Sequence, residues 1–211
     1  GDTLLLAPVV VPAFFPHLYK KLSFDPMNDL VPVAELGKFS FALAVGPEVP
    51  SEDLKSFIAW VKANPGKISY GSLSAGTPAH FLGVLFNEAA GTDMVHVPYK
   101  GAAPVLLALQ SGEIQAAFVV TGSAIKLHEA GKVRFLGVTG STRSTVAPKV
   151  PTFAESGLGL KSMDDASLWY GFFAPKETSA ATVAELNRHL VAALQADKVK
   201  AVLAAQDLTV S

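Results

Sequence analysis

The stretch from residue 68 to residue 80 combines small residues, hydroxyl groups and one histidine in a pattern that suits anion binding. A short β-prone segment leads into a loop of Gly, Ser and Ala residues, and Thr77-Pro78 then indicates a helix start with Thr77 as N-cap. The first N–H groups of a helix lack partners within the helix, and the helix dipole is positive at that end. Because no bulky side chain crowds the loop, we expect it to bind a small anion such as a carboxylate.

Two other interpretations of this stretch are open. Small residues also form ordinary tight turns between a strand and a helix in α/β proteins. Alternatively, Ser74 could be the nucleophile of an α/β hydrolase, although Ser72 stands where the G-x-S-x-G pattern has its first glycine. The acids and histidines that follow it in the order that such an enzyme needs are Asp93, Asp164, His128 and His189. The absence of a lysine before the helix excludes a phosphate-binding P-loop.

Further candidate ligand contacts lie outside the loop itself. His80 falls in the first turn of the expected helix, where it could face a ligand or make one local hydrogen bond. Thr121 follows an apolar strand and repeats the arrangement of strand, small polar loop and helix. Trp169-Tyr170 and residues 8–14 could form an apolar or aromatic wall of a cleft. Because the chain has no cysteine and its histidines lack metal-binding spacing, we expect no metal and no cofactor.

The composition limits the functional classes. The chain has 211 residues, half of them hydrophobic, and a formal net charge of −1. This composition is typical of a globular protein with a substantial core, and it gives no electrostatic reason to expect binding to nucleic acid or to an anionic membrane surface. No apolar run reaches the roughly 18 residues of a membrane-spanning helix.

The candidate residues require elements that alternate along the chain. Apolar, β-prone segments alternate with helical patterns from residue 39 to residue 173, which predicts an α/β fold with mostly parallel sheets flanked by helices. The strand candidates are 3–7, 30–36, 39–45, 68–70, 94–97, 114–120, 134–138 and 168–173. The helices are expected to begin near residues 54, 78, 104, 121, 179 and 198.

Several of these segments resemble one family in an ordered series. Residues 71–80 (GSLSAGTPAH), 96–101 (HVPYKG) and 112–114 (GEI) are similar to motifs in the substrate-binding proteins of tripartite tricarboxylate transporters, also called Bug receptors. Further matches are residues 3–6, 24–26, 64–67, 150–157 and 171–175. The resemblance implies a two-lobed, type II periplasmic-binding-protein fold. Lobe I would combine 1–46 with 140–211, lobe II would be 47–139, and the hinge strands would lie near 44–45 and 138–139.

The resemblance also implies a function. The protein would be a non-enzymatic periplasmic receptor that captures a small carboxylate in the cleft between its lobes and delivers it to the permease subunits of a membrane transporter, with no nucleic acid and no direct membrane insertion. The ligand-binding residues would be Ser72, Ser74, Ala75, Gly76, Thr77, His80, Thr121 and Tyr170. An orphan carboxylate sensor fits the same residues, and the hydrolase with Ser74 as nucleophile remains an alternative.

Two departures from the family pattern affect these expectations. The family's first strand and Gly-rich loop do not precede residue 3, and no signal peptide is present, so we expect an incomplete first lobe. Gln115 stands where the family usually has aspartate. If Gln115 contacts ligand, an amine-bearing ligand is disfavoured, whereas a bracing role for Gln115 would change nothing. The apolar segments at 8–14 and 169–170 favour an aromatic or aliphatic carboxylate over citrate.

Overall fold

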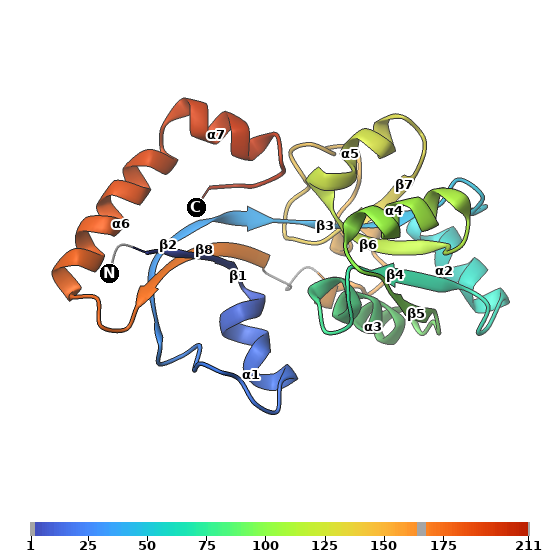
Figure 1. Ribbon diagram of the computed structural model, residues 1–211. Helices are drawn as coiled ribbons and strands as arrows, with labels where there is room; N and C mark the ends of the chain where they lie inside the picture. The colour runs from blue at the N-terminus through green and yellow to red at the C-terminus, as the bar shows by residue number, and fades with distance from the viewer. Residues whose placement is uncertain (1–2, 164–167, 211) are drawn as a thin grey trace. The chain divides into compact units, whose positions relative to one another are not determined.

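The computed structural model describes residues 3–163 and 168–210. The chain divides into two compact units, of which unit 1 comprises Gly1–Phe39 with Leu168–Ser211 and unit 2 comprises Ser40–Ser167. Each unit contains its own sheet, a three-stranded one in the order β1-β8-β2 and a five-stranded one in the order β5-β4-β6-β3-β7 (Figure 1). The expected mixed α/β fold is confirmed.

Unit 2 is a three-layer arrangement of helices and one sheet. Its strands are β3 (Phe41–Val45), β4 (Ser69–Ser72), β5 (Val95–Pro98), β6 (Ala116–Val120) and β7 (Arg134–Val138). Its helices are α2 (Leu54–Ala63), α3 (Pro78–Ala90), α4 (Ala102–Ser111) and α5 (Thr121–Glu129). Figure 1 shows α3 on one side of the sheet and α4 and α5 on the other.

The alternation of side chains along β6 explains this layering. Phe118 points into an aromatic cluster and contacts Phe86 of α3 and Phe153, at ring-centroid distances of 6.2 and 6.4 Å. Its neighbours Ala117 and Val119 belong instead to an apolar cluster that includes Leu109 of α4 and Ala124 of α5. An all-apolar strand covered on both faces is what the sequence of β3 and β6 predicts.

The expectation of mostly parallel sheets is wrong in part. In unit 2, β4 pairs in parallel with β5 and β6, but β3 pairs antiparallel with both β6 and β7. The alternation of strands and helices did not reveal this pairing, because β3 lies between two strands that follow it much later in the chain. In unit 1, β8 pairs antiparallel with both β1 and β2.

Local sequence signals set the helix ends of unit 2. Asp53 caps α2 by accepting a hydrogen bond from the backbone N–H of Ser56, whose side chain completes a capping box. Thr77 occupies the N-cap position of α3, as expected, but its side chain does not bond to the helix. Gly91 ends α3 in the left-handed conformation, at φ 62°. These helix ends therefore follow ordinary capping chemistry.

Unit 1 is built around β8, the middle strand of its sheet. The strands are β1 (Leu5–Pro8), β2 (Leu30–Phe39) and β8 (Leu168–Pro175). The helices are a π-helical turn (Val10–Phe14), α1 (Phe15–Leu18), α6 (Ala180–Leu194) and α7 (Asp197–Ala204). Residues 8–14, expected as an extended loop, are therefore mostly helical. Asn187 of α6 donates a hydrogen bond to the backbone oxygen of Val33, at 2.6 Å, which joins α6 to β2.

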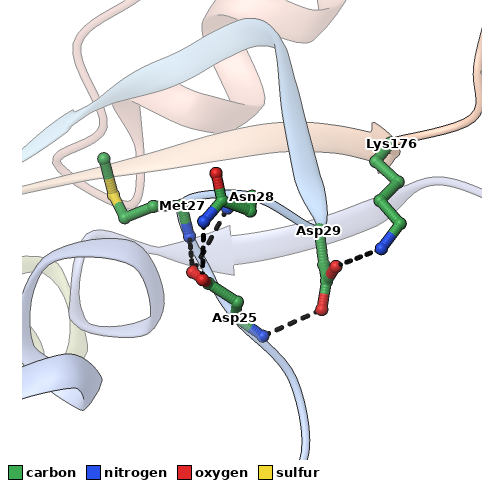
Figure 2. A network of polar contacts seen from close by, with 5 residues as sticks. All are labelled: Asp25, Met27, Asn28, Asp29 and Lys176. Carbon is green, nitrogen blue, oxygen red and sulfur yellow. Dashed lines mark hydrogen bonds and ion pairs between the residues drawn. The ribbon is translucent and has the colours of Figure 1, made fainter.

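A polar network closes the loop before β2 (Figure 2). The Asp25 carboxylate accepts hydrogen bonds from the backbone N–H groups of Met27 and Asn28 and from the Asn28 side chain. Asp29 accepts from the Asp25 backbone and forms an ion pair with Lys176, at 2.7 Å. Because Lys176 directly follows β8, this network ties the start of β2 to the end of β8.

The unit boundaries differ from the expected lobe boundaries. The expected breaks at 46/47 and 139/140 would separate β3 from the rest of unit 2, yet β3 hydrogen-bonds to β6 and β7 within one sheet. Beyond β7, Thr152 forms a parallel bridge with Val138, and Phe153 is fully buried in the core of unit 2. Two short 3₁₀ turns, Ala154–Ser156 and Lys161–Met163, follow. The chain therefore passes between the units after Phe39 and before Leu168.

Candidate carboxylate-binding site

The loop singled out in the sequence lies at one edge of the sheet in unit 2. Strands β4, β5 and β6 run parallel, so their carboxyl ends meet at the same edge, with Ser72 paired to Pro98. The loop from residue 73 to residue 77 leaves β4 there and enters α3. Thr121 follows β6 at the same edge. This edge, where loops follow parallel strands, is where open α/β sheets place their ligands.

Ser72 fixes the shape of the loop from below. Its hydroxyl is fully buried and donates a hydrogen bond to the backbone oxygen of Ser74, at 2.8 Å. The Thr77 hydroxyl donates to the same oxygen, at 2.7 Å. Both hydroxyls therefore fold the loop back on itself, and we assign the Ser72 hydroxyl to loop shape rather than to ligand contact.

The folded loop leaves a group of backbone N–H groups without acceptors. Within the described part of the chain, no acceptor pairs with the backbone N–H of Ser74, Ala75, Thr77 or Ala79. Ser74 and Ala75 are exposed, and the first turn of α3 holds no acidic side chain that could occupy these donors. Unpaired N–H groups at the positive end of a 13-residue helix form an anion-binding arrangement. Chemically, the loop can accept a carboxylate without any side-chain cation.

Two histidines lie beneath this loop. His80, in the first turn of α3, accepts a hydrogen bond at Nδ1 from the backbone N–H of Gly76, at 3.2 Å. His96, on β5, bonds through Nε2 to the Ser72 hydroxyl, at 2.7 Å. Burial, followed by the nearby charge of His80, lowers the pKa of His96. Sequence analysis noted His96 only as part of a motif. Its role follows from the parallel pairing of β4 and β5, which places it opposite Tyr70.

The contact between Ser72 and His96 is not a catalytic serine–histidine pair. The single proton of the Ser72 hydroxyl is donated to the oxygen of Ser74, so Nε2 of His96 must donate to the serine oxygen. A general base would accept the serine proton instead. The hydroxyl is also fully buried, so no substrate carbonyl can reach it.

The hydrolase alternative gains no support from the described residues. Asp93 accepts a hydrogen bond from the backbone N–H of Gly66, and the His128 ring stacks on Phe135. His189 lies on α6 of unit 1 and pairs with Glu185, at 3.7 Å. Within residues 3–163 and 168–210, no hydrogen bond joins the Ser74 hydroxyl to a histidine. Asp164 lies outside the described residues.

Thr121 adjoins the loop region but already has partners. Its buried hydroxyl lies 2.6 Å from the Ser40 hydroxyl, and its backbone N–H donates to the backbone oxygen of Ser40. Thr139 makes a similar pair of bonds with the Phe41 backbone. Both threonines thus fasten the start of β3 to the edge of the sheet, and ligand contact by Thr121 stays a prediction.

Tyr170 belongs to unit 1. It lies on β8, is half-buried, and stacks on Phe39 of β2 with ring centroids 4.8 Å apart. Its place among the ligand-binding residues stays a prediction.

Gln115 has a bracing role. Its side-chain oxygen accepts hydrogen bonds from the backbone and hydroxyl of Ser69, and its side-chain nitrogen donates to the oxygen of Gly112. Because Ser69 begins β4 and Gln115 precedes β6, these bonds lie at the opposite edge of the sheet from the 73–77 loop. The replacement of aspartate by Gln115 therefore leaves this loop unchanged.

The described residues contain no cluster of three or more metal-ligating side chains, and none of their helices is both long and apolar enough to cross a membrane.

Solved structures place this fold in a known class. A structure described as a periplasmic transporter is 37% identical, with a TM-score of 0.86, and the match covers 99% of this chain and 69% of that one. R. palustris Rpa4515 with adipate is 27% identical, with a TM-score of 0.89 and coverage of 100% and 69%. MatC from Rhodopseudomonas palustris with bound malate is 28% identical, with a TM-score of 0.83 and coverage of 98% and 69%. The fold is that of the periplasmic binding proteins.

Sequence comparison then identifies the family. Residues 1–211 match the model of the tripartite tricarboxylate transporter family receptor, TctC. The protein BugT of Bordetella pertussis is 34% identical over 210 residues, which cover 99% of this chain and 64% of BugT. The chain belongs to the TctC family, and the resemblance to Bug receptors is confirmed. It spans 56% and 64% of the length of two curated relatives from Bordetella pertussis.

Proposed function

We propose that this chain is the carboxylate-recognising part of a solute-binding receptor. The observation that carries the proposal is the set of unpaired backbone N–H groups at Ser74, Ala75, Thr77 and Ala79, where the loop enters α3. Each hydrogen bond from such a donor to a carboxylate is charge-assisted and stronger than a neutral one. A carboxylate is planar and has two acceptor oxygens, so it can use several of these donors at once.

The family supports this choice of ligand class. Two structural neighbours above 25% identity contain adipate and malate, which are both dicarboxylates. The ligand of this chain would belong to the same class, since the loop offers neutral donors rather than a cation cluster suited to phosphate. The residues that we propose for the site are Ser74, Ala75, Gly76 and Thr77 through their backbone, with His80 beside them.

Delivery of the ligand to a membrane permease, and a periplasmic location, complete the proposal. Both rest on the description of the family as transporter receptors and on the periplasmic neighbours. The protein would act without covalent chemistry, because its task is to bind and release a solute.

The test uses a carboxylate tethered in the loop. Ala75 is exposed, and in Ala75→Glu a side-chain carboxylate would compete for the same N–H groups. Calorimetric titration with adipate and with malate should show binding to the unsubstituted chain and a loss of more than about tenfold in Ala75→Glu. Leu107→Glu adds the same charge on exposed α4 and should bind as the unsubstituted chain does.

A panel of monocarboxylates, dicarboxylates, citrate and aromatic acids extends the test to specificity. A shift in melting temperature reports binding to the native state by mass action. Equal loss of binding in Ala75→Glu and Leu107→Glu would contradict the assignment of the site to this loop. Absence of binding to every acid would contradict the proposed function.

A further inference from the structure

The two imidazoles beneath the loop form a stacked pair. The rings of His80 and His96 lie with centroids 4.0 Å apart and an interplanar angle of 18°. They come from different elements, α3 and β5, and the Tyr70 ring of β4 packs against His96 at 5.1 Å. The pair thus joins the helix that the loop enters to the two strands beside it.

Each ring holds the loop through one hydrogen bond with a defined direction. Nδ1 of His80 accepts from the Gly76 backbone N–H, so the proton of a neutral His80 must reside on Nε2. Nε2 of His96 donates to the Ser72 hydroxyl, because that hydroxyl gives its own proton to Ser74. The loop therefore depends on two specific neutral tautomers.

Protonation is incompatible with this arrangement. A protonated His80 carries a hydrogen on Nδ1, which would then face the N–H of Gly76 as donor to donor. Two protonated rings at stacking distance would also repel each other, so the rings titrate as a coupled pair. Burial raises the pKa of Tyr70 to about 12, so this neighbour stays neutral and supplies no compensating charge. Within the described part of the chain, neither ring forms an ion pair with a carboxylate.

Resting on the proposed function, we propose that His80 and His96 are positioning residues that hold the carboxylate-binding loop in shape only while both rings are neutral, so that carboxylate affinity falls as the pH falls. Histidine is the side chain whose charge changes in this pH range. The sign is distinctive, because a protonated ring that merely attracted an anion would raise the affinity in acid.

Two substitutions separate the hydrogen bond from the charge. In His80→Asn, the side-chain oxygen takes the place of Nδ1 as an acceptor for Gly76 but does not titrate. In His96→Gln, the side-chain nitrogen takes the place of Nε2 as a donor to Ser72. His128→Asn is the matched control, because Nδ1 of His128 also accepts a backbone N–H, that of Phe135, at 3.4 Å, but at another place in unit 2.

The first measurement needs no ligand. NMR titration of the chain follows the Gly76 amide and the imidazole nitrogens between about pH 8 and pH 5.5, where histidine titrates. The Gly76 amide signal should shift together with His80, and its protection from hydrogen exchange should fall in acid. His80→Asn should abolish this change, and His128→Asn should leave it intact. A Gly76 signal that does not change with pH in the unsubstituted chain would overturn the proposal without any variant.

The second measurement is adipate binding between about pH 8 and pH 6, where carboxylates remain ionised. The unsubstituted chain should weaken by about tenfold, the equivalent of one lost hydrogen bond. His80→Asn and His96→Gln should bind nearly equally at both values, whereas His80→Ala should bind weakly at both. Tighter binding in acid, or the same pH profile in His80→Asn, would overturn the proposal. If no carboxylate binds at any pH, the proposed function fails, and the Gly76 titration decides separately whether the pair holds the loop.

Discussion

Ser72 shows how one buried hydroxyl organises the loop around it. Its oxygen links the backbone oxygen of Ser74 on one side to His96 on the other, and no part of the residue is exposed. The neighbouring Ser74 carries an exposed side chain and contributes to the loop through its backbone. Two serines in one short loop thus have different functions, and only their burial distinguishes them.

Ser72→Ala should therefore destabilise the protein more than Ser74→Ala. The substitution leaves the Nε2 donor of His96 and one lone pair of the Ser74 oxygen unsatisfied, which costs about 1–3 kcal/mol of the free energy of unfolding. Ser74→Ala removes an exposed hydroxyl and should change that free energy by less than about 0.5 kcal/mol. Urea denaturation measures both values. Equal effects would contradict the role assigned to the Ser72 hydroxyl.

His96 should make stability depend on pH. Burial lowers its pKa in the folded state, so as the pH falls the unfolded chain binds the proton first. The contribution to stability is present above about pH 6.5, the ordinary histidine value, and is lost as the pH falls toward the lower folded-state value. The difference in free energy of unfolding between the unsubstituted chain and His96→Gln should shrink in acid, as measured by denaturation between about pH 8 and pH 5. A difference that grows in acid would contradict the direction of this shift.

At the scale of elements, α3 rests on the ring of Tyr70. A Cβ atom added at Gly83 would overlap that ring, so the absence of a side chain at Gly83 sets how closely α3 approaches β4. The Tyr70 hydroxyl then donates to the backbone oxygen of His80, at 3.1 Å. The close contact thereby sets the position of His80 and, through it, of the loop.

Gly83→Ala should destabilise the protein although alanine is the better helix former. Helix propensity alone favours alanine by about 1 kcal/mol, but the overlap with Tyr70 forces α3 away from the sheet and should cost about 1–3 kcal/mol or more. Thermal denaturation should show a lower melting temperature. Val84→Ala, at the exposed neighbouring position, serves as the control and should change little. A stabilised Gly83→Ala would show that α3 can shift without penalty.

The ion pair between Asp29 and Lys176 links β2 to β8 in the network of Figure 2. The Lys176 side chain, followed by the Asp25 backbone N–H, lowers the pKa of Asp29. Its stabilising effect is present above the ordinary aspartate value of about 3.9 and is lost as the pH falls below it. Asp29→Asn should thus lower the melting temperature slightly near pH 7, with the difference vanishing toward about pH 3. Glu177→Gln, which removes a neighbouring negative charge, is the control. A difference that persists in acid would contradict the role of the charge.

Much of each element was predictable from neighbouring residues alone. The cap at Asp53, the start of α3 at Thr77 and its end at Gly91 all follow from local chemistry. The loop amides were predicted for the same reason, since they lie at a helix N-terminus. The partners of the loop were not, because His96 reaches Ser72 only through the pairing of β4 with β5.

At the scale of the molecule, distant pairing explains what the sequence did not reveal. The antiparallel placement of β8 between β1 and β2 joins residues about as far apart as Leu5 and Phe173. No local period records such a partner, and the directions of β3 and β8 were missed for this reason. Unit boundaries shifted with them, because β3 belongs to the sheet that it completes.

Unit 2 should fold by itself, because it is one continuous segment with a complete sheet and its own core. A fragment of residues 40–163 should show cooperative thermal unfolding and retain the coupling of Gly76 to His80 in NMR spectra. Unit 1 is assembled from two separate segments and offers no equivalent fragment. A non-cooperative 40–163 fragment would show that unit 2 depends on the rest of the chain.

The positions of β3 and β8 also bear on how the protein is made. During synthesis β1 and β2 emerge well before β8, which lies between them, and β3 must wait for both β6 and β7. Strand edges and apolar faces of the nascent chain thus remain uncovered while more than half of the sequence is still to be translated. Such edges are sites of aggregation in the cell. Production of this protein should therefore respond to chaperones that bind extended apolar segments, and slower translation would prolong the exposure.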